Sequence, residues 1–231
     1  MRDPKSVGQA LLDVCARHVP PEVLQFVTQG VPDSSKQFQR SLFFGYFAGV
    51  GRRTRELGFA LTPSERSQLV AAGVTVPEAW TLACTARVAL LAFACAALDA
   101  REHHGLLKEA YAKGDNGERI AVLRALSLLP DPRRFTDIAT EACRTHVQDV
   151  FEAICCDNPY PEHYFPDQSY NQLVIKALFT EVSLSRLQGL QARKNAELYR
   201  MARDYEAERR AASRTVTADL AYVAHALENE T

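Results

Sequence analysis

The stretch GERIAVLRALSLLPDPRRFTDIATEACRTHV, residues 117–147, decides the fold class, because apolar residues recur with a helical period on both sides of a turn. Helix-start signals stand at Asp115–Glu118 and at Asp131-Pro132. A tight turn is expected at 129–132. The two predicted apolar faces comprise Ile120, Leu123, Leu126 and Leu128 before the turn, and Phe135, Ile138, Ala139 and Ala142 after it. This pattern predicts a helical hairpin.

The same periodicity extends through most of the chain, and strand-like alternation is scarce. Thr62-Pro63-Ser64-Glu65 marks another helix start, residues 170–178 form an amphipathic stripe, and a long helix is expected over 185–213. We therefore predict an all-α protein, an irregular HEAT-like helical solenoid, with a plain helical bundle as the alternative. The hairpins vary in length, and no fixed repeat period is found.

Composition limits the possible functions. The chain has 231 residues, 47% of them apolar and 24% charged, with a formal net charge of −1. A chain of this length can bury a sizeable core. The near-zero net charge gives no general attraction to nucleic acid or anionic lipid, so we expect no nucleic-acid partner.

The longest apolar run is Ala79–Leu98, which is nearly long enough to span a bilayer. Arg87 lies near its middle, and an arginine at bilayer depth is costly. We expect no integral membrane segment and read this run as a central buried helix. A buried arginine usually pairs with a carboxylate, whose position the sequence does not give.

Six cysteines are spread through apolar sequence without a CxxC pair: Cys15, Cys84, Cys95, Cys143, Cys155 and Cys156. The first residues lack a continuous apolar run of the kind found in secretory signals. We interpret the cysteines as buried reduced thiols and expect a cytoplasmic location. The sequence has no Walker loop and no GxGxxG, HExxH or GxSxG motif.

The segment ICCDNPYPEHYFPDQSYNQLVIKALF, residues 154–179, interrupts the helical pattern with prolines, tyrosines and two adjacent cysteines. A Cys–His pair with His163 could form a nucleophile, and Asp157 could join a metal site. Adjacent cysteines suit a metal poorly because their side chains diverge. A rigid corner, with or without a ligand surface, accounts for more of these residues, since each proline restricts the residue before it. We expect no metal and no cofactor.

Two polar features have more than one interpretation. Asn171 shares a helical face with apolar residues and needs a hydrogen-bond partner, either the loop backbone or a ligand. The predicted 185–213 helix is rich in arginine, interspersed with acidic residues such as Glu206, which lies four residues before Arg210. A solvated or internally paired face is expected there rather than a phosphate-binding surface.

The segments ACRTHVQDVFEAICCDNPYPEHYFPDQSYNQLVIKALF (142–179) and RLQGLQARKNAELYRMARDYEAERRAASRTV (186–216), together with residues 117–135, resemble the EboA-domain family. The signature spans about 114–219, within a single all-α domain of residues 1–231. The most specific part is the pattern NPYP-x-x-YFP-x-x-x-x-NQ-x-x-x-KALF. The chain departs from the family near Ser183, where a proline would be expected.

The resemblance implies a bacterial protein of an ebo-type gene cluster, which assists the biosynthesis of specialised metabolites or their traffic towards the periplasm. It supplies no reaction, and no catalytic residue is assigned. Expected partners are a small-molecule metabolite or other ebo-cluster proteins. The motif positions, together with His163, form a candidate ligand or partner surface: Asn158, Tyr160, His163, Tyr164, Asn171, Lys176, Arg193, Glu197 and Arg209.

Three functions remain open: a non-catalytic accessory protein, a small-molecule-modifying enzyme of the same pathway, and a structural adaptor. The enzyme would use His163, Asn171 and arginines in a helical pocket. The adaptor would dock through the basic helix, including Arg200, Arg203 and Arg210.

Overall fold

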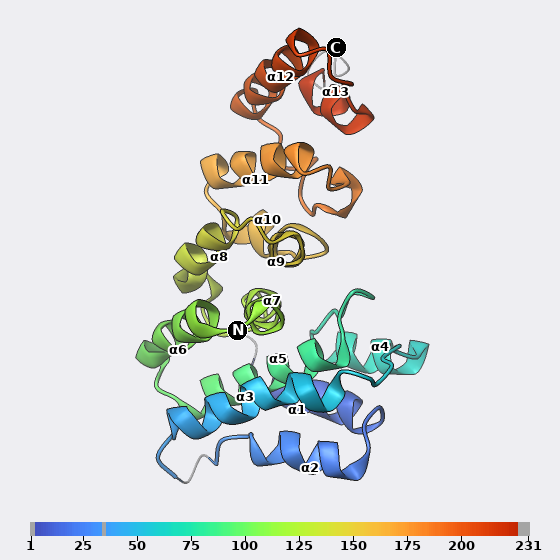
Figure 1. Cartoon of the computed structure of the whole chain (residues 1–231). Coiled ribbons are helices and arrows are strands. Elements are labelled where there is room, and N and C mark those ends of the chain that lie inside the picture. Colours follow the sequence, from blue (N-terminus) through green and yellow to red (C-terminus); the bar gives the residue numbers. More distant parts are fainter. Residues whose placement is uncertain (1–2, 34–35, 226–231) are drawn as a thin grey trace. The chain divides into compact units, whose positions relative to one another are not determined.

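The computed structural model describes residues 3–33 and 36–225 (Figure 1). Within them the regular structure consists of thirteen α-helices and two short 3₁₀ helices, without a strand. This confirms the all-α prediction, whereas the HEAT-like solenoid stays a prediction. The chain divides into two compact units, and the boundary in the sequence lies between Ala153 and Ile154.

Unit 1 runs to Ala153 and contains most of the helices. Its elements are α1 (Pro4–Ala16), α2 (Pro21–Gln29), α3 (Arg40–Thr54), α4 (Pro63–Ala71), α5 (Leu82–Ala97), α6 (Ala100–Lys113), α7 (Asn116–Ala125), η1 (Pro132–Phe135) and α8 (Thr136–Ala142). The next helix, α9 (Gln148–Cys155), crosses the boundary between the units.

The apolar run forms α5, the central helix of unit 1, which packs against α1, α3 and α7. Thirteen residues of α5 are buried, from Leu82 to Cys95, because neighbouring helices surround it. No helix among residues 3–33 and 36–225 is long and apolar enough to cross a membrane.

Arg87 lies inside this helix with a side chain that is only 4% exposed. Its guanidinium donates to the carbonyls of Phe47 (3.0 Å) and Ala48 (3.3 Å) of α3 and lies 3.6 Å from Glu118 Oε1 of α7. Burial lowers the pKa of Arg87, and the nearby carboxylates of Asp115 and Glu118 oppose that shift. The expected carboxylate partner is therefore Glu118, shared with two backbone carbonyls.

The predicted helix starts are confirmed in unit 1. Thr62 and Asp115 each form a full capping box, with Glu65 and Glu118 as their third helical residues. The turn between α7 and η1 places Asp131 in the left-handed region (φ 48°), directly before Pro132. The segment thus forms helix, turn and helix, but α7 packs on α5 and α6, and α8 packs on α6, so the mutual packing of the two predicted apolar faces stays a prediction.

Unit 2 begins at Ile154 and holds the signature region. After the end of α9 come α10 (Tyr160–Tyr164), α11 (Asp167–Phe179), η2 (Leu184–Arg186), α12 (Ala196–Ala211) and α13 (Ala218–Ala224). The helix α12 packs on α11 and on α13. Thr217 caps α13 through the backbone N–H of Leu220 (3.3 Å).

The expected long helix over 185–213 is wrong, because α12 begins only at Ala196. Gly189 adopts a left-handed conformation (φ 78°), and a Cβ there would collide with the side chain of Glu162. Asn195 then caps α12 by accepting from the N–H of Leu198 (3.0 Å). Leu187 and Leu190, which fall within the predicted helix, are buried from a non-helical connection instead.

Candidate functional site

The corner after α9 is fixed by its own polar residues. Asp157 lies in the left-handed region (φ 53°); its N–H donates to the carbonyl of Arg186 (2.8 Å), and its carboxylate accepts from the Arg186 guanidinium (3.1 Å). Asn158 is buried and accepts from the N–H of Tyr160 (3.0 Å) through Oδ1, which sets the start of α10. Its Oδ1 therefore has a structural role in the corner.

The aromatic residues of the corner pack mainly on one another. The ring of Tyr160 is fully buried, 4.9 Å from the ring of Tyr164 and 6.1 Å from that of Phe165. His163 is exposed, and the centre of its ring lies 6.0 Å from the centre of the Tyr164 ring in an edge-to-face arrangement. The adjacent Cys155 and Cys156 are buried. A buried thiol beside apolar side chains is a poor nucleophile, and neither cysteine shares an exposed surface with His163.

The Arg193 side chain holds the corner and the start of α11 together. It donates to the carbonyls of Pro161 (3.0 Å) and Glu162 (2.9 Å) in α10 and to the Asp167 carboxylate (2.5 Å) at the start of α11. Its guanidinium also lies 4.6 Å from the centre of the Tyr170 ring. These contacts make Arg193 a structural clamp rather than an open cation.

Tyr170, which the sequence predicts only as part of an amphipathic stripe, is buried. Its hydroxyl donates to the carbonyl of Gln188 (2.7 Å), which ties α11 to the connection before α12. Burial raises the pKa of Tyr170 to about 12, against the opposing charge of Arg193. The hydroxyl is thus a stable neutral donor.

Asn171 is 2% exposed, and the partner it needs is the side chain of Asn195. The two amides form a reciprocal pair: each Nδ2 donates to the other Oδ1 at 2.9 Å. Asn195 Nδ2 also donates to the carbonyl of Arg193 (3.1 Å), while Asn195 Oδ1 caps α12. One amide pair therefore fixes the start of α12 against the middle of α11.

An open groove of about 490 Å³ lies beside this amide pair, within unit 2. Its α11 side is formed by Asp167, Gln168, Asn171 and Gln172. Gln168 and Gln172 are both exposed, and they stand one helical turn apart on the same face of α11. Gln168 and Gln172 are not among the site residues predicted from the sequence.

The α12 side of the groove carries charges that form ion pairs with one another along the helix. Arg200 donates to both oxygens of Glu197 (2.7 and 2.9 Å) and to Asp204 (2.7 Å). Met201 and Ala196 supply apolar surface on the same side. The expectation of an internally paired α12 is confirmed for Arg200, and for Arg210, which pairs with Glu206 (2.7 Å).

Only two of the predicted surface residues, Asn171 and Glu197, line the groove. Arg209 lies near the far end of α12, about 20 Å along the helix from Ala196. There it donates to the carbonyl of Thr215 (2.7 Å) and to the hydroxyl of Tyr205 (3.0 Å). Lys176, in the last turns of α11, is half-buried and outside the groove lining. The predicted set thus forms several local structures rather than one surface.

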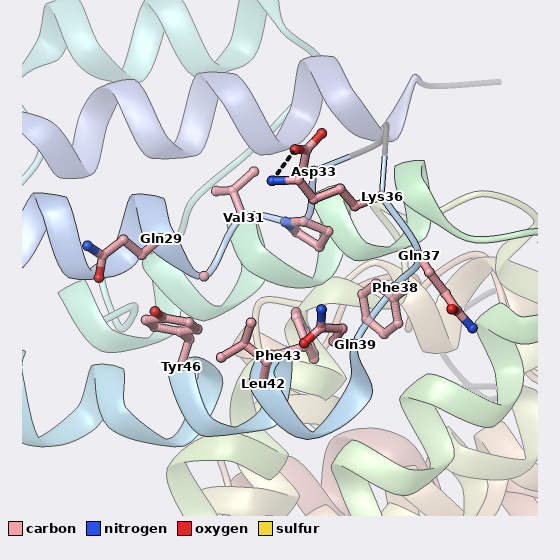
Figure 2. Close-up of a pocket in the computed structure, with 12 residues that line it drawn as sticks. Gln29, Val31, Asp33, Lys36, Gln37, Phe38, Gln39, Leu42, Phe43 and Tyr46 are labelled. Atoms are coloured by element: carbon pink, nitrogen blue, oxygen red, sulfur yellow. Dashed lines mark ion pairs between the residues drawn. The ribbon is translucent and has the colours of Figure 1, made fainter.

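A second cavity of about 270 Å³ lies in unit 1, between the end of α2 and the start of α3. Figure 2 shows Val31 together with Phe38, Leu42 and Tyr46 around it. It is mostly apolar and contains none of the predicted site residues. In the part of the chain that the structure describes, no group of three or more His, Cys, Asp or Glu side chains could hold a metal ion.

Comparison with protein families matches residues 7–224 to one family, described as metabolite traffic protein EboA. No curated protein and no solved structure matches the chain.

Proposed function

Since the chain belongs to the EboA family, we propose that it assists metabolite traffic by binding a small molecule in the groove between α11 and α12. In this proposal it is a non-catalytic, cytoplasmic accessory protein of an ebo-type cluster, serving specialised-metabolite biosynthesis or traffic towards the periplasm. A pathway protein could receive the molecule from it.

The observation that carries this proposal is the groove beside the Asn171–Asn195 pair. Its volume of about 490 Å³ falls within the range of about 300 to 1,000 Å³ that is usual for small-molecule sites. Because the amide pair fixes the start of α12 to α11, the two walls are held in place before any ligand arrives. Rigid walls lower the ordering cost of binding.

The enzyme alternative has weaker support. The residues predicted for an enzyme are His163, Asn171 and arginines. The Asn171 amide is hydrogen-bonded to Asn195, and Arg193 is hydrogen-bonded to residues of α10 and α11. His163 is exposed on the corner and does not line the groove. General acid–base chemistry requires these groups to converge within hydrogen-bonding reach of one substrate.

The adaptor alternative depends on available positive charge along α12. All three arginines are exposed, but Arg200 and Arg210 both have carboxylate partners on the same helix, and only Arg203 has no ion pair among the described residues. Paired surface charges attract a distant partner less strongly than unpaired ones. A small-molecule site therefore remains the better-supported function.

The test is a groove-filling substitution in the producing host. Ala196→Trp places an indole at the groove wall, whereas Ala207→Trp adds the same ring to an exposed position farther along α12. Metabolite profiles of cytoplasmic and periplasmic fractions should change with Ala196→Trp and stay as in the unaltered protein with Ala207→Trp. Unchanged profiles for both variants, with normal protein levels, would contradict the proposal.

A further inference from the structure

We infer that the groove ligand is an uncharged, hydroxyl-rich small molecule, of the class of sugars and cyclic polyols, held by the side-chain amides of Gln168 and Gln172. This inference rests on the proposed function, because it names the ligand class of the same groove. The inference depends on two observations: some hydrogen-bonding groups in the groove have no partner among the residues that the structure describes, and the charged groups already have one.

The two glutamine amides are the open groups. Both side chains are exposed at the groove, and neither takes part in a hydrogen bond or ion pair with any other residue of 3–33 and 36–225. Each amide offers two donor hydrogens and one acceptor oxygen. A hydroxyl group likewise donates one hydrogen and accepts others, so neighbouring hydroxyls match two amides one turn apart.

The positive charges near the groove are already engaged. Arg200 donates hydrogen bonds from Nε and both terminal nitrogens to Glu197 and Asp204, and Arg193 donates to the Asp167 carboxylate. The charged lining residues, Asp167, Glu197 and Arg200, give the groove wall a formal net charge of −1, and the partners Arg193 and Asp204 lie outside the lining. A phosphate or carboxylate ligand would meet this negative wall without an open cation to pair with.

Two helix starts face the groove, and helix N-termini generally favour anions. Here each start already has its own carboxylate in the first turn, Asp167 in α11 and Glu197 in α12. Each of these carboxylates repels a further anion at its helix start, and the start of α12 is also capped by Asn195. Both carboxylates also have an arginine partner, so neither requires a cationic ligand.

Met201 adds apolar surface to the α12 wall, opposite the glutamine amides of α11. Its flexible thioether side chain lines the groove beside Ala196. The carbon-bound hydrogens of a polyol ring form a weakly apolar face that can rest on such a surface, while the ring hydroxyls reach the amides. The α12 wall thus combines Met201 and Ala196 with the ion-paired Glu197 and Arg200, while the α11 wall offers the two open amides beside Asp167.

The experiment uses the full chain labelled with ¹⁵N and follows the side-chain NH₂ signals of Gln168 and Gln172. Glucose and myo-inositol serve as neutral probes, and glucose 6-phosphate and inorganic phosphate as anionic probes. The neutral probes should shift both signals. Glucose 6-phosphate should bind about tenfold more weakly than glucose, as expected for like charges several ångströms apart at a half-exposed site.

A matched pair of variants connects the signals to binding. Replacing both Gln168 and Gln172 with leucine should weaken glucose binding about 30-fold, through the loss of two neutral hydrogen bonds. Gln188→Leu changes an exposed glutamine of unit 2 that lies outside the groove lining and should leave binding unchanged. Equal weakening in both variants would overturn the assignment to these two amides.

The outcomes separate the ligand class from the proposed function. If an anionic probe binds the groove more tightly than glucose, the class is wrong while ligand binding stands. If no probe shifts the two signals but host-purified protein carries a small-molecule mass, the class is again wrong. If neither probe binding nor such a mass is found, both the inference and the proposed function fail.

Discussion

The amide pair between Asn171 and Asn195 gives the sharpest prediction, because its two hydrogen bonds can be separated from the helix cap that Asn195 also provides. Asn171→Ala removes the pair and leaves the cap. Asn195→Ser also removes the pair but retains a side-chain oxygen that caps helices well. Comparing the two variants isolates the pair.

The expected magnitude follows from the contacts. Two neutral hydrogen bonds contribute about 1 kcal/mol each, so the coupling energy should be about 2 kcal/mol. Asn195 retains bonds to Arg193 O and Leu198 N–H in the Asn171→Ala variant, which limits the penalty for an unsatisfied amide. Each single variant should therefore lose about 2 to 3 kcal/mol, and the double variant little more than one single variant.

Amide hydrogen exchange followed by mass spectrometry is the suitable assay, because it reports the stability of residues 167–179 and 196–211 separately from unit 1. The single tryptophan, Trp80, belongs to unit 1 and provides a fluorescence control there. Losses that add fully in the double variant, with a coupling below about 0.5 kcal/mol, would refute the reciprocal amide pair.

Three further outcomes follow from the structure. Burial raises the pKa of Glu65, but hydrogen bonds to Thr62, Arg17 and His18 outweigh burial and lower this pKa to about 2. The stabilisation by the ionised Glu65 is therefore complete above about pH 4.5 and is lost as the pH falls towards 2. Acid unfolding of Glu65→Gln should show a smaller dependence of stability on pH in this range. Gly189→Ala should destabilise unit 2 by more than about 1 kcal/mol in hydrogen exchange, because residue 189 has a positive φ. Gly45→Ala is the control: Gly45 is exposed in α3, no atom lies near the added Cβ, and the variant should stabilise α3 by about 0.5 to 1 kcal/mol. Arg87→Met should cost about 3 kcal/mol in urea unfolding followed by Trp80 fluorescence, since it leaves Glu118 and two backbone carbonyls without a buried donor; a loss below about 1 kcal/mol would contradict that role.

Local sequence signals predicted much of the fold. The capping boxes at Thr62 and Asp115 are formed as expected, because each depends on residues within three positions of one another. The central buried helix was likewise evident from its continuous apolar run.

The start of α12 could not be predicted in the same way. Leu187 and Leu190 continue the apolar stripe of the helix, so periodicity alone extends α12 too far towards the N-terminus. Contacts from distant residues favour the non-helical connection: the Tyr170 hydroxyl binds Gln188 O, and Arg193 binds carbonyls of α10. Gly189 was the local signal that a break was possible.

The candidate site shows the same division between local and distant information. The burial of Asn171 was predictable from its helical face, but its partner Asn195 is 24 residues away and follows only from the packing of α11 on α12. Gln168 and Gln172 are exposed helical glutamines, which composition and spacing do not distinguish from solvated surface. Their interest arises from the groove they share.

The central claim is that a small molecule binds in the α11–α12 groove, and native mass spectrometry of protein purified from its producing host tests it most directly. We predict an additional small-molecule mass that is lost on denaturation, absent from the Ala196→Trp variant and retained by the Ala207→Trp variant. A bare chain in all three samples, or an additional mass that persists in Ala196→Trp, would contradict the claim.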